Sequence, residues 1–147
     1  MHVEGRFATK APVDRVFALF RDPVAFTDCL DDPHQFHAVD PTHFEGQITT
    51  GVAFIRGTFR VRGEYTESTA NQRIGAKLTG TGMGSGLDAS FSIGFQTGPD
   101  GTSVAWSGEI TLTGTAATVG ERLVRGTVDK KAGGLFENAR RKLEGPA

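Results

Sequence analysis

Apolar and polar residues alternate through much of the chain between Phe44 and Leu112. The clearest stretch runs from Gly51 to Tyr65. One side of it carries Ala53, Ile55, Gly57, Phe59, Val61, Gly63 and Tyr65, and the other carries Arg56, Thr58, Arg60, Arg62 and Glu64. A period of two is typical of a half-buried strand. Because the apolar side almost lacks ionisable residues, we interpret it as the wall of a dry cavity, which favours a binding protein over an enzyme.

The same pattern predicts seven strands separated by turn residues. The first strand covers Val3, Gly5 and Phe7, ends before Pro12, and lies at or near a sheet edge. The other six are expected at residues 34–39, 43–50, 52–67, 73–81, 86–97 and 102–113. The connections between them are short, as at residues 98–101, so most successive strands are predicted to be antiparallel neighbours.

Two short helices are predicted after the first strand. The first begins at Pro12 and ends near Arg21, and its apolar stripe consists of Val13, Val16, Phe17 and Phe20. Asp22 is the expected N-cap of the second, which begins at Pro23 and runs to about Leu30.

The hydrophobic period changes to three and four after residue 115. Ala117, Gly120, Val124, Val128, Leu135 and Ala139 recur at this spacing. We predict one long amphipathic helix over residues 116–143, about 28 residues or about 42 Å in length. The sheet needs a cover for its apolar face, and this helix is the only predicted element long enough to supply it. The fold class is therefore α+β, with a seven-stranded antiparallel sheet around a long C-terminal helix.

Glycine occupies several inward strand positions among large apolar residues. The large inward residues are Phe7, Phe44, Ile48, Ile55, Phe59, Ile74, Leu78, Phe91, Ile93, Trp106 and Ile110, and the inward glycines are Gly5, Gly46, Gly57, Gly63, Gly80 and Gly108. Two explanations are open: the sheet bends so that the helix packs closely, or a void of a few hundred Å³ remains for an apolar ligand.

The predicted ligand site follows from the second explanation. We expect its cavity to be lined by Phe44, Ile55, Phe59, Tyr65, Leu78, Phe91, Ile93, Trp106, Ile110, Val124, Val128 and Leu135, with Met83 at the mouth. Tyr65 and Trp106 are the candidate polar groups that would orient a ligand; the alternative is that both are ordinary buried aromatic residues with satisfied donors.

The long helix carries four glycines, Gly120, Gly126, Gly133 and Gly134, each of which costs about 1 kcal/mol relative to alanine. Close approach of the helix to the sheet would explain them. The alternative is a flexible point in the helix at Gly133 and Gly134 that lets the cavity open.

Candidate catalytic and metal-binding residues are few. Cys29, His34, His37 and His43 lie within fifteen residues, but His34 and His37 would point to opposite faces of one strand, so a shared metal ion is disfavoured. The glycine-rich residues 80–86 fit no phosphate-binding pattern. The strand hydroxyls and carboxylates take the outward positions: Ser90, Ser92, Ser103, Ser107, Glu45, Glu64, Asp88 and Glu109. We therefore predict no catalytic group, metal or cofactor.

Basic residues form a stripe on the outward face of two predicted strands. Its members are Arg56, Arg60, Arg62, Arg73 and Lys77. A solvated sheet face is the default interpretation, and an anionic protein or lipid headgroup is the alternative. Nucleic acid is disfavoured, because the formal net charge is -1 and only Phe54 interleaves with the stripe.

Length and composition are those of one globular domain. The chain has 147 residues, of which 37% are hydrophobic, so we expect a single domain over residues 1–147. It has no apolar run of about 18 residues, and its start lacks the apolar centre of a secretory signal. With Cys29 as its one cysteine, an internal disulfide is excluded, which fits the cytoplasm. The oligomeric state is open, and a homodimer is one option.

The order of these motifs resembles the carbon monoxide dehydrogenase G-subunit family over nearly the whole chain. The matching residues are Val3-x-Gly5-x-Phe7, Ala11-Pro12-x-x-x-Val16-Phe17, Asp22-Pro23, Cys29-Leu30 with Pro33, Gly57-Thr58-Phe59, Gly120-x-x-Leu123-x-x-Gly126 and Leu135-Phe136-x-Asn138. The family belongs to the START-like (SRPBCC) helix-grip superfamily of hydrophobic-ligand binders. The resemblance implies a curved sheet gripping the terminal helix around an internal cavity.

The resemblance also implies a biological setting. Family members accompany molybdenum-containing enzymes of the carbon monoxide dehydrogenase type and are linked to their recruitment to the membrane or to handling quinone. Longer members carry a membrane-anchoring tail after the helix; this sequence stops at Ala147, so we expect membrane contact to be peripheral at most. Asp31 and Asp32 replace the family's usual proline and glycine, which leaves the local loop and its partner contacts open.

Three functions follow from this interpretation. The first is non-enzymatic binding of a quinone or lipid-like molecule, in the service of a molybdenum hydroxylase. The second is a cyclase- or dehydratase-like enzyme, which would need an inward acid-base pair. The third is a protein-docking module, which predicts a filled core and an exposed patch around Phe54 or Met83.

Overall fold

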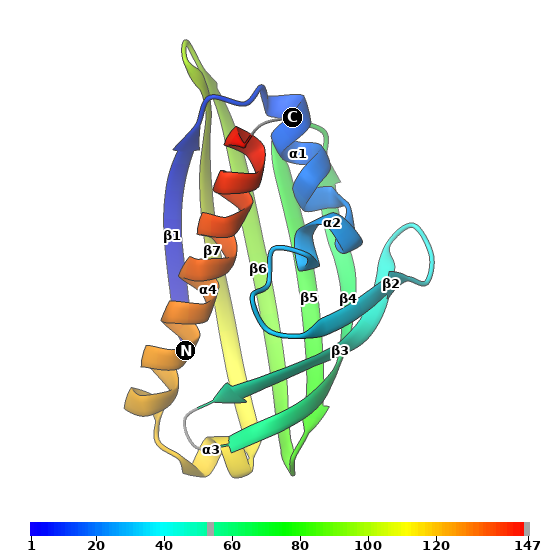
Figure 1. Ribbon diagram of the computed structural model, residues 1–147, viewed down its shortest axis with the longest axis vertical. Helices are drawn as coiled ribbons and strands as arrows, with labels where there is room; N and C mark the ends of the chain where they lie inside the picture. Colours follow the sequence, from blue (N-terminus) through cyan, green and yellow to red (C-terminus); the bar gives the residue numbers. More distant parts are fainter. Residues whose placement is uncertain (53–54, 146–147) are drawn as a thin grey trace.

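The computed structural model describes residues 1–52 and 55–145, which contain a curved antiparallel sheet and four helices (Figure 1). The elements are β1 (His2–Thr9), α1 (Val13–Arg21), α2 (Pro23–Thr27), β2 (His34–Ala38), β3 (His43–Val52), β4 (Ile55–Thr69), β5 (Arg73–Gly82), β6 (Ser85–Gly98), β7 (Gly101–Gly114), α3 (Thr115–Thr118) and α4 (Glu121–Glu144). Within these residues seven strands pair in the order β1-β7-β6-β5-β4-β3-β2. The predicted fold class is confirmed, and β1 is an edge strand as expected.

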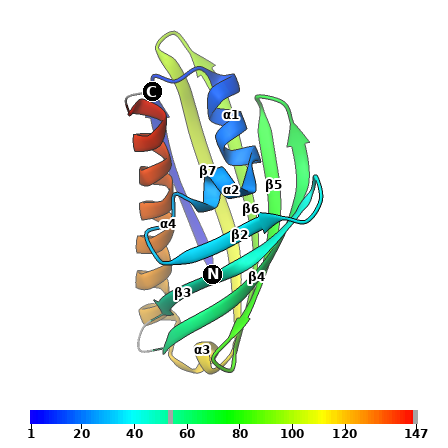
Figure 2. The same ribbon diagram turned by 45° about the vertical axis from the view of Figure 1, so that its right-hand side comes forward.

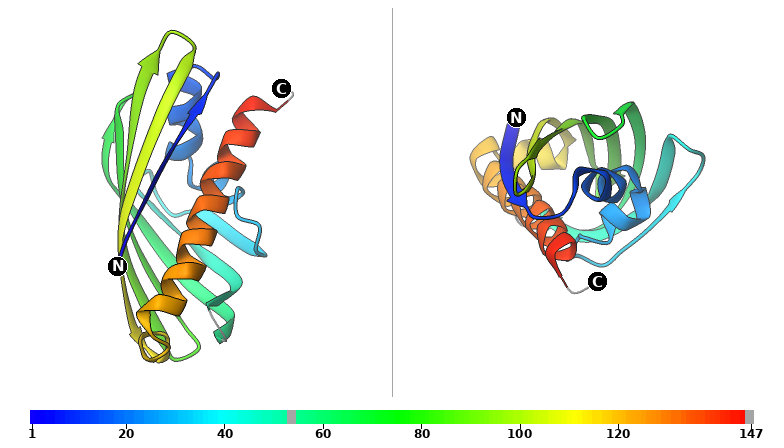
Figure 3. Two further views of the ribbon diagram at one scale, coloured as in Figure 1. Left: turned by 90° about the vertical axis from the view of Figure 1, so that its left-hand side faces the viewer. Right: turned by 90° about the horizontal axis from the view of Figure 1, so that it is seen from above.

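The sheet curves around the helices. Figure 2 shows β2 and β3 crossing in front of the molecule, and Figure 3 shows from above that the sheet surrounds α1 and α2, with α4 along its open side. The α4 residues Val124, Phe136, Ala139 and Leu143 are buried, and Val128 and Leu135 are partly buried against the core. The predicted apolar face of the terminal helix is therefore confirmed from Val124 to Leu143, whereas Ala117 and Gly120, which the pattern also assigns to it, are exposed.

The inward and outward positions follow the predicted alternation. Every large residue of the predicted inward set is buried or partly buried, whereas the polar side of β4, from Arg56 to Glu64, is exposed. The N-cap is also confirmed, because Asp22 Oδ1 accepts hydrogen bonds from the backbone N–H groups of Val24 and Ala25. The second helix ends at Thr27, earlier than expected. Its last turn tightens there, since the N–H of Leu30 donates to the carbonyl of Thr27.

One predicted strand boundary is wrong. The alternation predicts a strand over residues 52–67, but Val52 ends β3 and Ile55 begins β4, and the two residues pair across the hairpin. Gly51 pairs with Arg56 and lies on the outward side, because the inward parity changes from even numbers in β3 to odd numbers in β4. Ala53 and Phe54, which the sequence assigns to the inward face and the basic stripe, lie outside the described residues.

The glycine-rich residues 80–86 form a tight hairpin in place of the longer strand connection that the sequence suggests. β5 extends to Gly82 and β6 begins at Ser85. The two residues between them, Met83 and Gly84, have φ values of 53° and 72°. Positive φ at both central residues is the signature of the turn that matches the twist of a two-stranded ribbon.

The terminal helix is interrupted near its start. Gly120 has φ 105° and separates α3 from α4, so the predicted helix over residues 116–143 is two helices. The longer one has 24 residues, which corresponds to about 36 Å. Gly126, Gly133 and Gly134 lie within it, and a Cβ added at any of them would meet no atom of the described residues within 4 Å. Close approach of the helix to the sheet therefore does not explain these three glycines. The flexible point at Gly133 and Gly134 stays a prediction.

Candidate ligand cavities

Two apolar cavities lie between the sheet and the elements that cover it. The first, which we call the aromatic cavity, has a volume of about 110 Å³ and is lined by Phe20, Phe26, Phe44, Tyr65, Ile74, Ala76, Leu78, Phe91, Ile93, Leu135 and Phe136. The second, which we call the aliphatic cavity, has a volume of about 130 Å³ and is lined by Ile48, Thr50, Ile55, Phe59, Val61, Gly80, Ser85, Gly86, Leu87, Leu112 and Ala116.

Three phenylalanines from three helices cover the aromatic cavity. Phe20 of α1, Phe26 of α2 and Phe136 of α4 have ring centroids 5.0 to 5.8 Å apart. Their tilted and edge-on arrangement is the favourable geometry for aromatic rings. Sequence reasoning placed none of the three at the site. The apolar stripe of the first helix pointed to Phe20, but no sequence signal shows which strand residues a helix will face.

Three of the inward glycines are covered by aromatic rings of neighbouring strands. Gly63 is directly opposite Phe44 in the sheet register, and a Cβ on Gly63 would overlap that ring. The same relation holds for Gly5 with Trp106 and for Gly108 with Phe91. Neither of the two explanations offered by the sequence accounts for these three glycines, because a side chain from the next strand occupies the space. At Gly46 the nearest atom is the backbone carbonyl oxygen of Gln35 on β2, so close approach of the neighbouring backbone accounts for that glycine. Gly80 differs: its nearest neighbours would lie 3.7 Å from an added Cβ, and it lines the aliphatic cavity.

The two candidate polar handles are held within the core. Tyr65 Oη donates a hydrogen bond of 2.9 Å to the carbonyl oxygen of Phe20, and the Arg21 guanidinium lies 4.1 Å from the tyrosine ring centroid. Burial raises the pKa of the Tyr65 phenol. Trp106 stacks on Phe136 with ring centroids 4.4 Å apart and planes 7° apart. Tyr65 is thus a buried aromatic residue with a satisfied donor, which is the alternative that the sequence left open for it.

The structure brings most, but not all, of the predicted cavity residues together. Phe44, Tyr65, Leu78, Phe91, Ile93 and Leu135 line the aromatic cavity, and Ile55 and Phe59 line the aliphatic cavity. Ile110 and Val124 line a separate open groove beside α3, and Trp106 and Val128 pack in the core. Met83 is outside both linings; its side chain is 53% exposed and lies over Gly57.

Both hydroxyls that line the aliphatic cavity are already hydrogen-bonded. Thr50 Oγ1 donates to Asp32 Oδ2 at 2.9 Å, and Ser85 Oγ accepts from the backbone N–H of Ala116 at 2.9 Å. Tyr65 is the one ionisable side chain among the residues that line the two cavities. A carboxylate, imidazole or amine that could act as an acid or base is therefore missing from these linings.

The loop between α2 and β2 is fastened to α4 by its acidic residues Asp31 and Asp32. Asp32 Oδ2 accepts a 2.9 Å hydrogen bond from Lys131 Nζ in addition to the bond from Thr50. Asn138 Nδ2 donates to Asp31 Oδ1 and to the carbonyl of Cys29. Burial on its own would raise the pKa of Asp32, but the hydrogen bonds from Lys131 and Thr50 outweigh it and lower the pKa. The loop, residues 28–33, thus connects β3 to α4, and we call it the strap.

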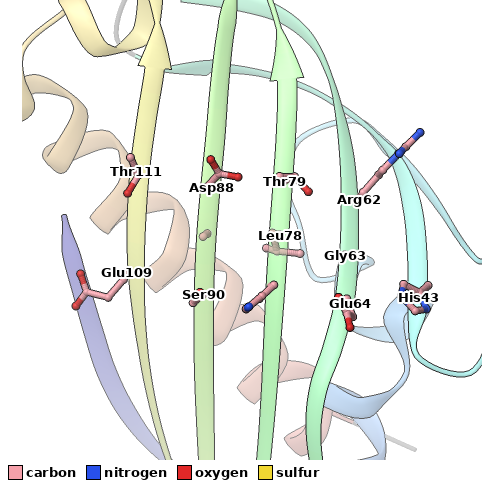
Figure 4. A pocket seen from close by; sticks show the side chains of 12 residues that line it. His43, Arg62, Gly63, Glu64, Leu78, Thr79, Asp88, Ser90, Glu109 and Thr111 are labelled. Atoms are coloured by element: carbon pink, nitrogen blue, oxygen red, sulfur yellow. The ribbon is translucent and has the colours of Figure 1, made fainter.

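The outer face of the sheet carries mixed charge. Figure 4 shows side chains from β3 to β7 in rows that cross the strands, with Arg62, Glu64 and Asp88 in a shallow polar basin of about 420 Å³. Arg62 is 84% exposed, and its Nε lies 4.0 Å from Glu45 Oε2. Acidic groups therefore interrupt the predicted basic stripe, which agrees with a solvated sheet face.

The histidines lie beside carboxylates instead of beside one another. His34 contacts Asp28, His37 contacts Glu45, and the remaining two pair with Glu109 and Asp40. Within residues 1–52 and 55–145, no three histidine, cysteine, aspartate or glutamate residues cluster as metal ligands would. Burial raises the pKa of the Cys29 thiol, whose Sγ lies 3.6 Å from the carbonyl of Ala25.

A family model for the G subunit of carbon monoxide dehydrogenase (CoxG) matches residues 5–144. The chain belongs to the CoxG family. The matched range includes the residues that line both cavities, the strap and all of α4. A search of curated protein sequences finds no significant match.

Solved structures share the START-like fold at low sequence identity. A conserved protein from Geobacillus kaustophilus has a TM-score of 0.88 and 16% identity, with 98% of this chain and 95% of that chain covered. A START superfamily protein from Mycobacterium smegmatis has a TM-score of 0.75 and 11% identity, covering 97% of each chain. The Zhui aromatase/cyclase from Streptomyces sp. R1128 has a TM-score of 0.75 and 14% identity, covering 98% and 93%. In the part of this chain that the structure describes, no helix is both long and apolar enough to cross a bilayer.

Proposed function

We propose that this CoxG family protein binds an apolar small molecule on the inner face of the sheet, beneath the covering helices, without transforming it. The observation that carries the proposal is the pair of cavities, whose linings contain apolar side chains and polar groups that are already hydrogen-bonded. A charged or strongly polar ligand would lose its hydration there without gaining partners. An apolar ligand gains about 25 cal/mol for each Å² that it removes from water.

The ligand class that fits these linings is a quinone or a lipid-like molecule. Planar rings suit the phenylalanine-rich aromatic cavity, and an aliphatic chain suits the second cavity. The family is described as part of carbon monoxide dehydrogenase. We therefore infer a role as an accessory protein of a molybdenum hydroxylase of that type, acting in the cytoplasm with at most peripheral membrane contact.

The enzymatic alternative needs a reactive group inside the cavities. The Zhui aromatase/cyclase shares the fold, which by itself assigns no activity to this chain. Tyr65 is the one ionisable side chain in the two linings, its proton is donated to Phe20, and its raised pKa keeps it neutral at physiological pH. These features support a carrier in preference to a cyclase.

Ligand recovery and ligand competition test the proposal together. Native mass spectrometry and organic extraction of the purified protein should recover an apolar compound. The fluorescent probe N-phenyl-1-naphthylamine should bind, and Ala76→Leu, which fills part of the aromatic cavity, should weaken its binding at least tenfold. Ala105→Leu on the exposed face of β7 is the matched control and should leave binding unchanged. Failure to recover any apolar compound, together with equal probe binding by both variants, would contradict the carrier function.

A further inference from the structure

One row of side chains separates the two cavities. Cross-strand pairs join Phe44, Gly63, Leu78, Ala89 and Ile110 into a continuous line across β3, β4, β5, β6 and β7. The aromatic cavity lies on one side of this line and the aliphatic cavity on the other, since β5 contributes Ala76 to the first and Gly80 to the second. Gly63 and Ala89 have little or no side chain, and Ile110 lines the groove beside α3 instead of either cavity. Phe44 and Leu78 therefore supply the bulk between the cavities.

Phe44 and Leu78 differ in conformational freedom. Phe44 is 7% exposed and lies over Gly63, with its ring centroid 5.5 Å from that of Tyr65 and 6.5 Å from that of Phe36. Leu78 is only partly buried, and its neighbours along the row on either side are Gly63 and Ala89. Phe44 is therefore wedged among other rings and fills the space above Gly63, whereas Leu78 has the small residue Ala89 on its other side and can change rotamer there.

Cavity size decides what the site can hold. Ligand pockets usually have volumes of roughly 300 to 1,000 Å³, and a cavity of about 150 Å³ holds a molecule the size of benzene. The aromatic and aliphatic cavities, at about 110 and 130 Å³, each have room for a single small group. A quinone or lipid-like molecule fits only if it occupies both cavities at once.

We propose that Phe44 and Leu78 form a partition that sets the length of the ligand. This inference rests on the proposed function. The ligand class is an elongated apolar molecule, with a ring in the aromatic cavity and an aliphatic chain that passes Leu78 into the aliphatic cavity. The four residue steps from Ala76 to Gly80 span about 13 Å along β5, which is the distance that the chain must bridge.

A series of phenylalkanes from ethylbenzene to dodecylbenzene tests the partition, by displacement of N-phenyl-1-naphthylamine. Each methylene group that becomes buried should improve affinity about fourfold. In the wild-type protein we expect this gain in affinity per methylene group to stop at the chain length that reaches Leu78, because the partition must move. We call this chain length the break. Leu78→Ala should remove this break and raise the affinity for the longest chains at least tenfold relative to ethylbenzene.

Two further variants make the result specific. Leu87→Ala makes the same substitution in the aliphatic cavity, away from the row, and should leave the break at the same chain length. In Gly63→Ala the new Cβ would overlap the Phe44 ring and should displace it into the space between the cavities, which should weaken long-chain binding at least tenfold relative to ethylbenzene. Should Gly63→Ala fail to fold, the two leucine variants still decide the question.

Each outcome bears on a different claim. A break that stays in Leu78→Ala, or that disappears equally in Leu87→Ala, overturns the partition while apolar binding stands. Absence of probe and phenylalkane binding in the wild-type protein overturns the proposed function itself. A break that moves only in Leu78→Ala supports both.

Discussion

Replacement of Asp32 by asparagine tests whether the strap stabilises the grip of the sheet on α4. The substitution keeps an oxygen acceptor for Thr50 but removes the charge that pairs with Lys131 at 2.9 Å. The two charged side chains are 30% and 37% exposed, so solvent screens the pair. We take the upper end of the range for exposed pairs and expect a loss of about 1 kcal/mol in the free energy of unfolding, or about 2 to 4 °C in Tm.

The pH dependence of this loss has a definite sign. The pKa of Asp32 is lowered in the folded protein from its ordinary value of 3.8. The group therefore stabilises the fold above pH 3.8, and this contribution disappears as the pH falls through the lower folded pKa. The difference between wild type and Asp32→Asn should be full at pH 7 and should shrink below pH 3.8. Urea unfolding, followed by the fluorescence of the single tryptophan, Trp106, measures it at each pH.

A double-mutant cycle assigns the effect to the ion pair. Lys131→Met, combined with Asp32→Asn, should give a coupling energy of about 0.5 to 1 kcal/mol that decreases in 1 M salt. Asp88→Asn on the exposed outer face is the control and should change stability by less than about 0.5 kcal/mol. The reasoning is refuted if Asp32→Asn is as stable as wild type at pH 7, or if its deficit is the same at pH 3 and pH 7.

Three other substitutions probe the packing around the cavities, each measured by urea unfolding. Tyr65→Phe leaves a buried carbonyl of α1 without its donor and should cost about 1 to 3 kcal/mol; an unchanged midpoint would contradict the hydrogen bond. Phe136→Ala should cost about 3 to 5 kcal/mol and shift the emission of Trp106 to longer wavelength, whereas unshifted emission would argue against the stacked pair. Gly101→Ala should cost more than about 1 kcal/mol, because φ is 135° and the new Cβ would overlap the carbonyl of Thr9; a neutral effect would contradict the turn geometry.

The elements of the fold were predictable because local rules specify them. Asp22 before Pro23 indicated a helix start, and the side-chain cap is present. The turn at residues 98–101 indicated a hairpin, and β6 and β7 pair across it. The predictions were wrong where local rules are ambiguous. The alternation of apolar and polar residues continues across the β3–β4 hairpin with a change of parity, so the boundary between the two strands was misplaced. Gly120 fits the helical period, but its backbone separates α3 from α4.

The site was less predictable, because it depends on contacts between distant segments. Phe26 and Phe136 are 110 positions apart, and their meeting depends on how α2 and α4 sit over the sheet. The same is true of Lys131 and Asp32. The inward position of Gly63 was evident from parity, but the ring above it comes from Phe44 on the neighbouring strand, which only the register determines.

The sequence by itself determined which residues face inward, because strand and helix periodicity follow from backbone geometry within each element. It also determined that these faces are apolar and that acids, bases and hydroxyls lie mainly on the other side. Only the tertiary structure decided how much space remains between the apolar faces. Packed protein interiors leave few voids, so the volume of a cavity is a small difference between the enclosed volume and the volume of the side chains that fill it. The rotation of one aromatic ring onto a glycine is therefore enough to create or remove a cavity. The pattern identified the walls, and the register of Phe44 with Gly63 and of Leu78 with Ala89 divided the space within them.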